Sequence, residues 1–250
     1  MEDTESSRMK PAAVGLRAHS GWASLVAVSG LLNSSQAGRT LPSSCIPRVI
    51  IRRRLSLAHP GSSPQPYHAA QAAVLGAAGA AGLTHRGAKQ RVVQQAGRAL
   101  NLARAEESIQ QASREAFRLA KQGLQALLLE LRREGYVLRG CGLLIGSGRV
   151  PAQLAATLAS HIAIHTAEGE LFRNALAHAA EDRGLRVMRI PERNLLAQAS
   201  VTLSLSAEDL QTQVTELGKA LGPPWREDEK LPTLAAWLVL ADLTRQIEQS

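Results

Sequence analysis

The sequence predicts a mixed α/β domain in which helices flank a single sheet. Three observations support this expectation. Three early segments show the alternation of small, β-branched and polar residues that is typical of strands, and one very long helical segment follows them. After it, short apolar strand patterns alternate with helices, an order that predicts parallel strands in the same sheet. With 250 residues, 45% of them apolar, the chain is long enough to bury a real core.

The first strands are expected within residues 12–29, either as two segments that meet at His19-Ser20-Gly21 or as one long bent strand. A loop rich in Asn, Ser, Gly and Pro follows over residues 31–47. The next strand is expected over residues 48–57, and a cluster of chain breakers fills residues 60–66. Residues 1–10 carry no apolar pattern and are predicted to be a disordered tail, with Met9 as a plausible second start. Residues 11–250 are predicted to form one domain.

A long helical region is expected over residues 67–134. Its first part, near residues 69–105, contains several glycines and is predicted to be a low-complexity helical insertion, because each interior glycine costs about 1 kcal/mol of helix stability. Residues 106–133 predict a well-formed helix with one apolar stripe, which Gly135 ends. This helix is a candidate surface for a protein partner.

The second half alternates strands and helices. Strands are expected over residues 136–145, 161–165 and 185–190. Helices are expected after Pro151 and over residues 168–183, 192–199, 207–221 and 227–248.

Composition limits the classes of function. A net charge of +8 and a pI near 10.3 favour an anionic partner, a nucleic acid or nucleotide, although a solvated basic face explains the same charge. Aromatic residues are only 3%, which disfavours binding of single strands by stacking. Cys45 and Cys141 are too far apart in sequence to predict a disulfide scaffold or zinc knuckle. No signal peptide or membrane span is evident, so we expect a cytoplasmic protein. We also predict that it needs no cofactor or metal.

Two polar clusters are candidates for chemistry. His165, with Glu168 or Glu170, is expected where a strand meets a helix, and an imidazole beside a carboxylate can act as an acid/base pair. The alternative is that Thr166 caps the helix and the two glutamates complement its positive end. His19 in the first strand could supply a second imidazole, or it could be a structural histidine.

A second candidate site binds an anion. Gly146, Ser147, Gly148 and Arg149 connect a strand to a helix, and backbone N–H groups in such a turn suit a phosphate or carboxylate. Their spacing matches neither of the common phosphate-binding fingerprints, so a plain turn is the alternative. Arg17, on the first strand, is predicted to add a positive charge beside this turn.

Three features of the chain resemble the ribonuclease H-like fold of Holliday-junction resolvases. They are the order of elements, residues 14–23 with their Gly-Trp pair, and the helix-strand-Pro unit at residues 171–192. That resemblance implies carboxylates on the first strand, on a later strand and on the last helix, which hold two metal ions. Here Arg17 occupies the first position, the strand over residues 138–145 contains no acid, and only Glu227, Asp228 and Glu229 remain. The resemblance therefore implies that metal-dependent nuclease chemistry has been lost.

We thus expect a non-nuclease ribonuclease H-like domain that acts as a binding or regulatory module for a nucleic acid or nucleotide. Two alternatives stay open: an enzyme of another chemistry that uses His19, His165, Glu168 and Glu170, or a structural protein that uses helix 106–133.

Overall fold

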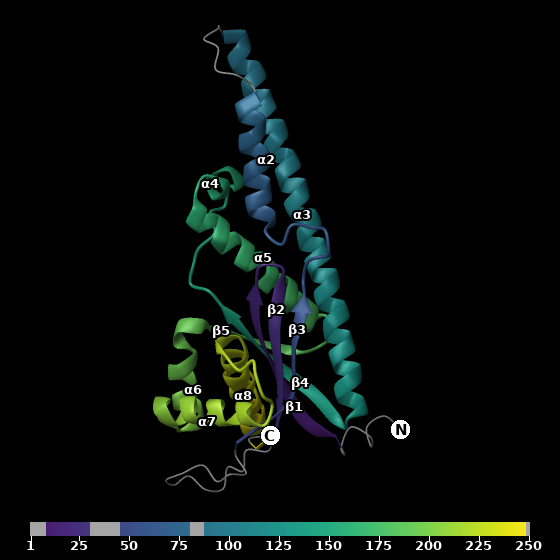
Figure 1. Ribbon diagram of the computed structural model, residues 1–250, viewed down its shortest axis with the longest axis vertical. Coiled ribbons are helices and arrows are strands. Elements are labelled where there is room, and N and C mark those ends of the chain that lie inside the picture. Colours follow the sequence, from purple (N-terminus) through teal and green to yellow (C-terminus); the bar gives the residue numbers. More distant parts are fainter. Residues whose placement is uncertain (1–8, 31–45, 81–87, 249–250) are drawn as a thin grey trace.

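A five-stranded mixed sheet forms the centre of the molecule (Figure 1). The computed structural model describes residues 9–30, 46–80 and 88–248. The strand order is β3-β2-β1-β4-β5, and only β2 runs antiparallel to its neighbours. The strands are β1 (Lys10–His19), β2 (Trp22–Ser29), β3 (Arg48–Ser56), β4 (Tyr136–Ile145) and β5 (Arg186–Pro191). This order confirms the α/β class and the ribonuclease H-like arrangement expected from the sequence.

The β1–β2 hairpin follows from its sequence. Gly21 has a φ of +79°, a left-handed conformation that glycine adopts without strain, and this allows the tight turn after His19. Alternate residues of β1 then face opposite sides of the sheet. Ala12, Val14 and Leu16 belong to the main core on one side, and Gly15 and Arg17 face the other.

Helices cover both faces of the sheet. On one side lie α3 (Ala88–Arg133) and α5 (His161–Glu181), with α2 (Pro66–Ala80) and the short α4 (Leu154–Leu158) beside them. On the other lies α8 (Glu227–Glu248), against which α6 (Leu195–Leu203) and α7 (Ala207–Lys219) pack. A 3₁₀ turn, η2 (Glu192–Asn194), joins β5 to α6.

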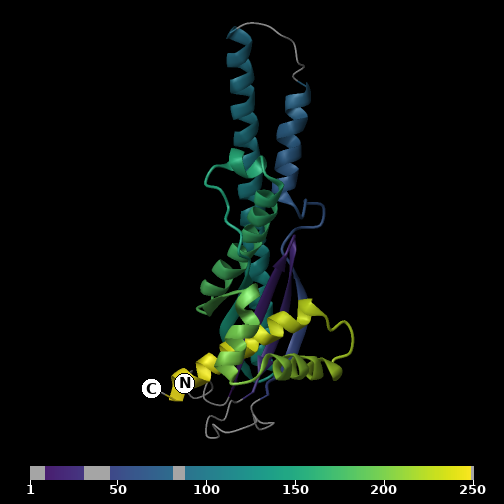
Figure 2. The same cartoon turned by 90° about the vertical axis from the view of Figure 1, so that its left-hand side faces the viewer.

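Helices α2 and α3 project together from this body, as both views show (Figures 1 and 2). The 46 residues of α3 give it a length of about 69 Å. Helix α2 ends at Ala80, and the next helix begins at Ala88 rather than near residue 106. Residues 69–80 and 88–105 of the predicted insertion belong to this pair, and residues 81–87 lie outside the described part, as do residues 1–8 of the predicted tail.

The apolar stripe of α3 is used by the domain itself. Its fully buried side chains are Ala116, Ala120, Leu124, Leu127 and Leu131, which pack against the sheet and α5. A partner at residues 106–133 would therefore meet the polar face of the helix. Among the described residues, no helix is long and apolar enough to cross a membrane.

The strand expected at residues 161–165 is wrong, because these residues form the first turns of α5. Ser160 caps this helix, and its side chain accepts a hydrogen bond from the Ala163 amide. The buried residues Ile164, Ala167 and Leu171 follow the helical period. Thr166 is not the cap: its hydroxyl donates to the carbonyl oxygen of Ile162.

Candidate functional site

Helix α8 lies against the sheet backbone at two glycines. Gly15 of β1 pairs with Gly142 of β4. A Cβ atom at Gly142 would lie 2.8 Å from the carbonyl oxygen of Ala235, and one at Gly15 would collide with that of Pro232. This close approach brings the N-terminal turn of α8, which carries Asp228, over the end of β1.

Arg17 is the centre of the polar cluster at this end of the sheet. It lies two residues after Gly15, so its side chain faces α8. Its Nε and Nη2 atoms donate to Glu192 at 3.1 and 2.7 Å, and its Nη1 donates to Oδ1 of Asp228 at 2.7 Å. Glu192 comes from η2, directly after β5, and reaches past the end of β4. Two carboxylates from distant parts of the chain thus share one guanidinium.

Burial and pairing act in opposite directions on Arg17. Burial would lower the pKa of Arg17, but hydrogen bonding to Glu192 and the charges of Glu192 and Asp228 outweigh it and raise that pKa. The guanidinium is therefore a permanent cation at this position. The anions that Arg17 contacts belong to the chain itself.

His19 extends the same cluster. Its ring stacks on Trp22 with centroids 4.0 Å apart, and the guanidinium of Arg54 lies 3.9 Å from the Trp22 ring centroid. Its Nε2 is buried 3.0 Å from Oδ1 of Asp228, without the alignment of a hydrogen bond. Burial lowers the pKa of His19 in spite of the opposing attraction of Asp228. The neutral ring is thus part of a packed stack.

His165 and Glu168 belong to a different cluster. His165, in the second turn of α5, lies next to His161 and to His68 of α2. The buried carboxylate of Glu168 contacts His68, at 3.0 Å from its Nδ1 atom. Glu170 instead pairs with Arg173 at 3.0 Å. The structure therefore joins His165 to Glu168 through His68, while His19 takes part in the Arg17 cluster.

The predicted anion-binding turn is an exposed segment between β4 and α4. All four residues, Gly146 to Arg149, are exposed. The helix that follows, α4, has five residues and no side-chain cap on its first turn. The guanidinium of Arg173 lies next to Gly146. Anion binding at this turn stays a prediction.

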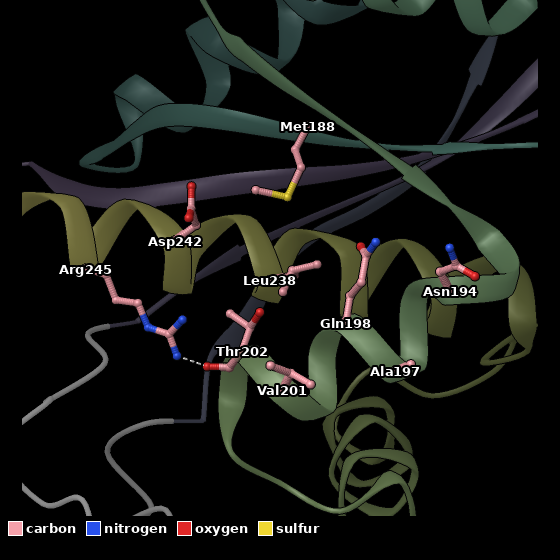
Figure 3. A pocket seen from close by; sticks show the side chains of 9 residues that line it. All are labelled: Met188, Asn194, Ala197, Gln198, Val201, Thr202, Leu238, Asp242 and Arg245. Atoms are coloured by element: carbon pink, nitrogen blue, oxygen red, sulfur yellow. Dashed lines mark hydrogen bonds between the residues drawn. The ribbon is translucent and has the colours of Figure 1, made fainter.

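A shallow pocket of about 510 Å³ lies between β5, α6 and α8 (Figure 3). Its charged side chains are already engaged, since Arg245 donates to the carbonyl oxygen of Thr202 and Asp242 pairs with Arg186. The rest of its lining is largely apolar or amide side chains, such as Met188, Leu238 and Gln198. The side chains that line this pocket do not form a group that could act as a catalytic site.

Sequence reasoning missed Glu192, His68 and His161. Glu192 is the first acid after a strand, which is a weak signal for a site at a sheet edge. His161 and His165 are four residues apart, and this spacing places two side chains side by side on a helix. His68 gave no signal, because its proximity to α5 depends on how the two helices pack.

Known structures offer a comparison for the fold. RuvC from Thermus thermophilus in complex with Holliday junction substrate is similar over 94% of this chain and 95% of that chain, at 8% identity and a TM-score of 0.47. Another structure of Thermus thermophilus RuvC is similar over 94% of this chain and 96% of that chain, at 12% identity and a TM-score of 0.44. No protein-family model and no curated protein matches the sequence. The sheet order β3-β2-β1-β4-β5 agrees with the arrangement that the sequence resemblance implied.

Proposed function

We propose that this chain is a ribonuclease H-like domain that binds a nucleic acid or nucleotide without cleaving it. The observation that supports the loss of cleavage is the guanidinium of Arg17 between Glu192 and Asp228. The resemblance implies that a carboxylate of β1 and another of α8 would hold metal ions here. An arginine has no lone pair to offer a metal and brings a positive charge instead.

The guanidinium offsets one of the two carboxylate charges that would attract a divalent ion. Two unit charges 4 Å apart interact by about 4 kcal/mol at an effective dielectric constant of about 20, so the guanidinium repels a divalent ion by about 8 kcal/mol, which cancels the attraction of one carboxylate. In addition, the ion would have to break the three hydrogen bonds that Glu192 and Asp228 accept. Strand β4, which separates these groups, contributes no acid to replace them.

The partner class follows from charge. Lys and Arg number 29 against 21 Asp and Glu, which favours a polyanion. Trp22, one of few aromatic residues, is already stacked between His19 and Arg54 and is not offered to a base. Binding should therefore depend on phosphate contacts and weaken steeply as salt increases.

The enzymatic alternative has less support. It needs His19 to act with His165, Glu168 and Glu170, but His19 contacts Asp228 and Trp22, and Glu170 contacts Arg173. Only His165 and Glu168 share a cluster.

The proposal is tested by cleavage and binding assays on the full chain. We expect no cleavage of branched or duplex DNA with Mg²⁺ or Mn²⁺, and binding to the same DNA whose affinity falls log-linearly with salt. Metal-dependent cleavage that Asp228→Asn abolishes would overturn the loss of catalysis. Absence of DNA and nucleotide binding at low salt would overturn the partner class.

A gain of metal binding gives a sharper test. The wild-type unfolding temperature should not respond to Mg²⁺, whereas that of Arg17→Asp should rise with Mg²⁺, because three carboxylates then meet at one point. Arg17→Asn, which removes the charge without adding a ligand carboxylate, is the matched control. An equal Mg²⁺ response in the wild type would show that the guanidinium does not exclude the ion.

A further inference from the structure

Three imidazoles from two helices meet away from the Arg17 cluster. His161 and His165 are one turn apart on α5, and His68 projects from the first turn of α2. One ring nitrogen of each lies within 4.8 Å of the others. The rings meet edge to face, with centroids 4.4 Å apart for His161 and His165 and 4.7 Å for His68 and His165.

We propose that these three histidines bind a divalent transition-metal ion of the zinc type. A regular tetrahedral site with Zn–N bonds of about 2.0–2.1 Å separates two ligand nitrogens by about 3.3–3.4 Å. The Nε2 atoms of His161 and His165 are 3.3 Å apart. The spacing of these two ligands therefore matches a shared ion, and small rotations of His68 bring in the third.

Glu168 prepares His68 for this role. Its Oε1 lies 3.0 Å from Nδ1 of His68 and also accepts from the His68 backbone N–H at 3.2 Å. A proton on Nδ1 that is held by this carboxylate leaves the Nε2 lone pair of His68 free for a metal. Carboxylates commonly orient metal-binding histidines in this way.

The burial of Glu168 is a second, independent observation. Only 1% of the residue is exposed, its Oε2 atom is buried without a hydrogen-bond partner, and His68 is its ion-pair partner among the described residues. A buried carboxylate needs a compensating positive charge. A divalent ion on His68 would supply that charge one imidazole away.

The ligand set also selects the ion. Imidazole nitrogens suit Zn²⁺, Co²⁺, Ni²⁺ and Cu²⁺, whereas Mg²⁺ and Ca²⁺ require oxygen ligands. Because His161 and His165 are exposed, the fourth position faces solvent and would hold water. The ion would join α2, and thus the base of the projecting helix pair, to α5.

The test is a Co²⁺ titration of the full chain after removal of any purification tag and of bound metal with a chelator. We expect one equivalent of Co²⁺ to give the visible absorption of a four-coordinate site, and Zn²⁺ to displace it. His161→Ala and His165→Ala should each remove this absorption. Glu168→Gln, which keeps the shape but not the charge, should weaken affinity about 10- to 100-fold.

His178→Ala is the matched control, because His178 is exposed on the last turn of the same helix and lies outside the cluster. It should bind Co²⁺ like the wild type. Far-ultraviolet circular dichroism of the metal-free variants shows that each is folded. No Co²⁺ absorption in the wild type, or a spectrum that survives His165→Ala, would overturn the proposal.

Discussion

Removing the guanidinium of Arg17 should destabilise the domain measurably. Arg17→Ala deletes three charge-assisted hydrogen bonds and leaves Glu192 and Asp228 facing each other. Buried bonds of this type contribute about 1.5–3 kcal/mol each. Here the Asp228 and Glu192 side chains are 31% and 40% exposed, so water recovers much of that loss. We expect a net loss of about 2 kcal/mol, or about 4–8 °C in unfolding temperature for a chain of this size.

The assay is chemical and thermal unfolding at neutral pH, followed by circular dichroism. Arg118→Ala, which removes an ion pair on the exposed side of α3, should leave the midpoint unchanged. The loss should be smaller when Arg17→Ala is made in an Asp228→Asn background, because one unpaired charge is then absent. An unchanged midpoint for Arg17→Ala, or full additivity with Asp228→Asn, would refute the reasoning.

Three further outcomes are expected. Gly15→Ala should lower the free energy of unfolding by at least about 2 kcal/mol, because the added Cβ meets the backbone of α8. The control Gly76→Ala, in open space on α2, should be neutral or stabilising. Equal unfolding midpoints for the two variants would contradict the close approach of α8 to Gly15. Burial lowers the pKa of His19 from 6.5, so the folded chain binds this proton less readily than the unfolded chain. The free energy of unfolding should therefore fall as the pH drops below about 6.5. His19→Gln should make the free energy of unfolding less dependent on pH in this range. Burial raises the pKa of the Cys141 thiol to about 12. In a Cys45→Ser background, no thiol should therefore react with Ellman's reagent until the protein unfolds. Rapid reaction of the native protein would show that strand β4 opens.

Local patterns predicted most of the fold. The early strands, the β1–β2 turn, β4, β5 and the helical second half all follow from periodicity and from glycines at turns. The failure at residues 161–165 has a physical cause: Ile162, Ala163 and Ile164 form a short apolar run that periodicity cannot assign to a strand or a helix, and only the longer run to Leu171 reveals the helical period.

The site was less accessible to prediction. Arg17, at a position where the resemblance implies an acid, was visible in sequence, and so were the acids around Asp228. Their pairing was not, because Arg17 and Asp228 are 211 positions apart in the sequence and only the packing of α8 on Gly15 brings them together. The strand assignment at residues 161–165 also hid the histidine pair, since residues four apart on a strand are too distant to share an ion.

The Arg17 cluster makes the attachment of α8 independent of ion supply. A helix held to a sheet through a bound metal is stabilised by an amount that grows with the free metal concentration and disappears under chelation. A guanidinium on β1 is always present at the same effective concentration, because the chain itself delivers it. Chelators and metal starvation should therefore leave the junction of α8 with the sheet intact. A bound ion would hold α8 to the sheet only while the ion is present, whereas Arg17 is a permanent part of the chain.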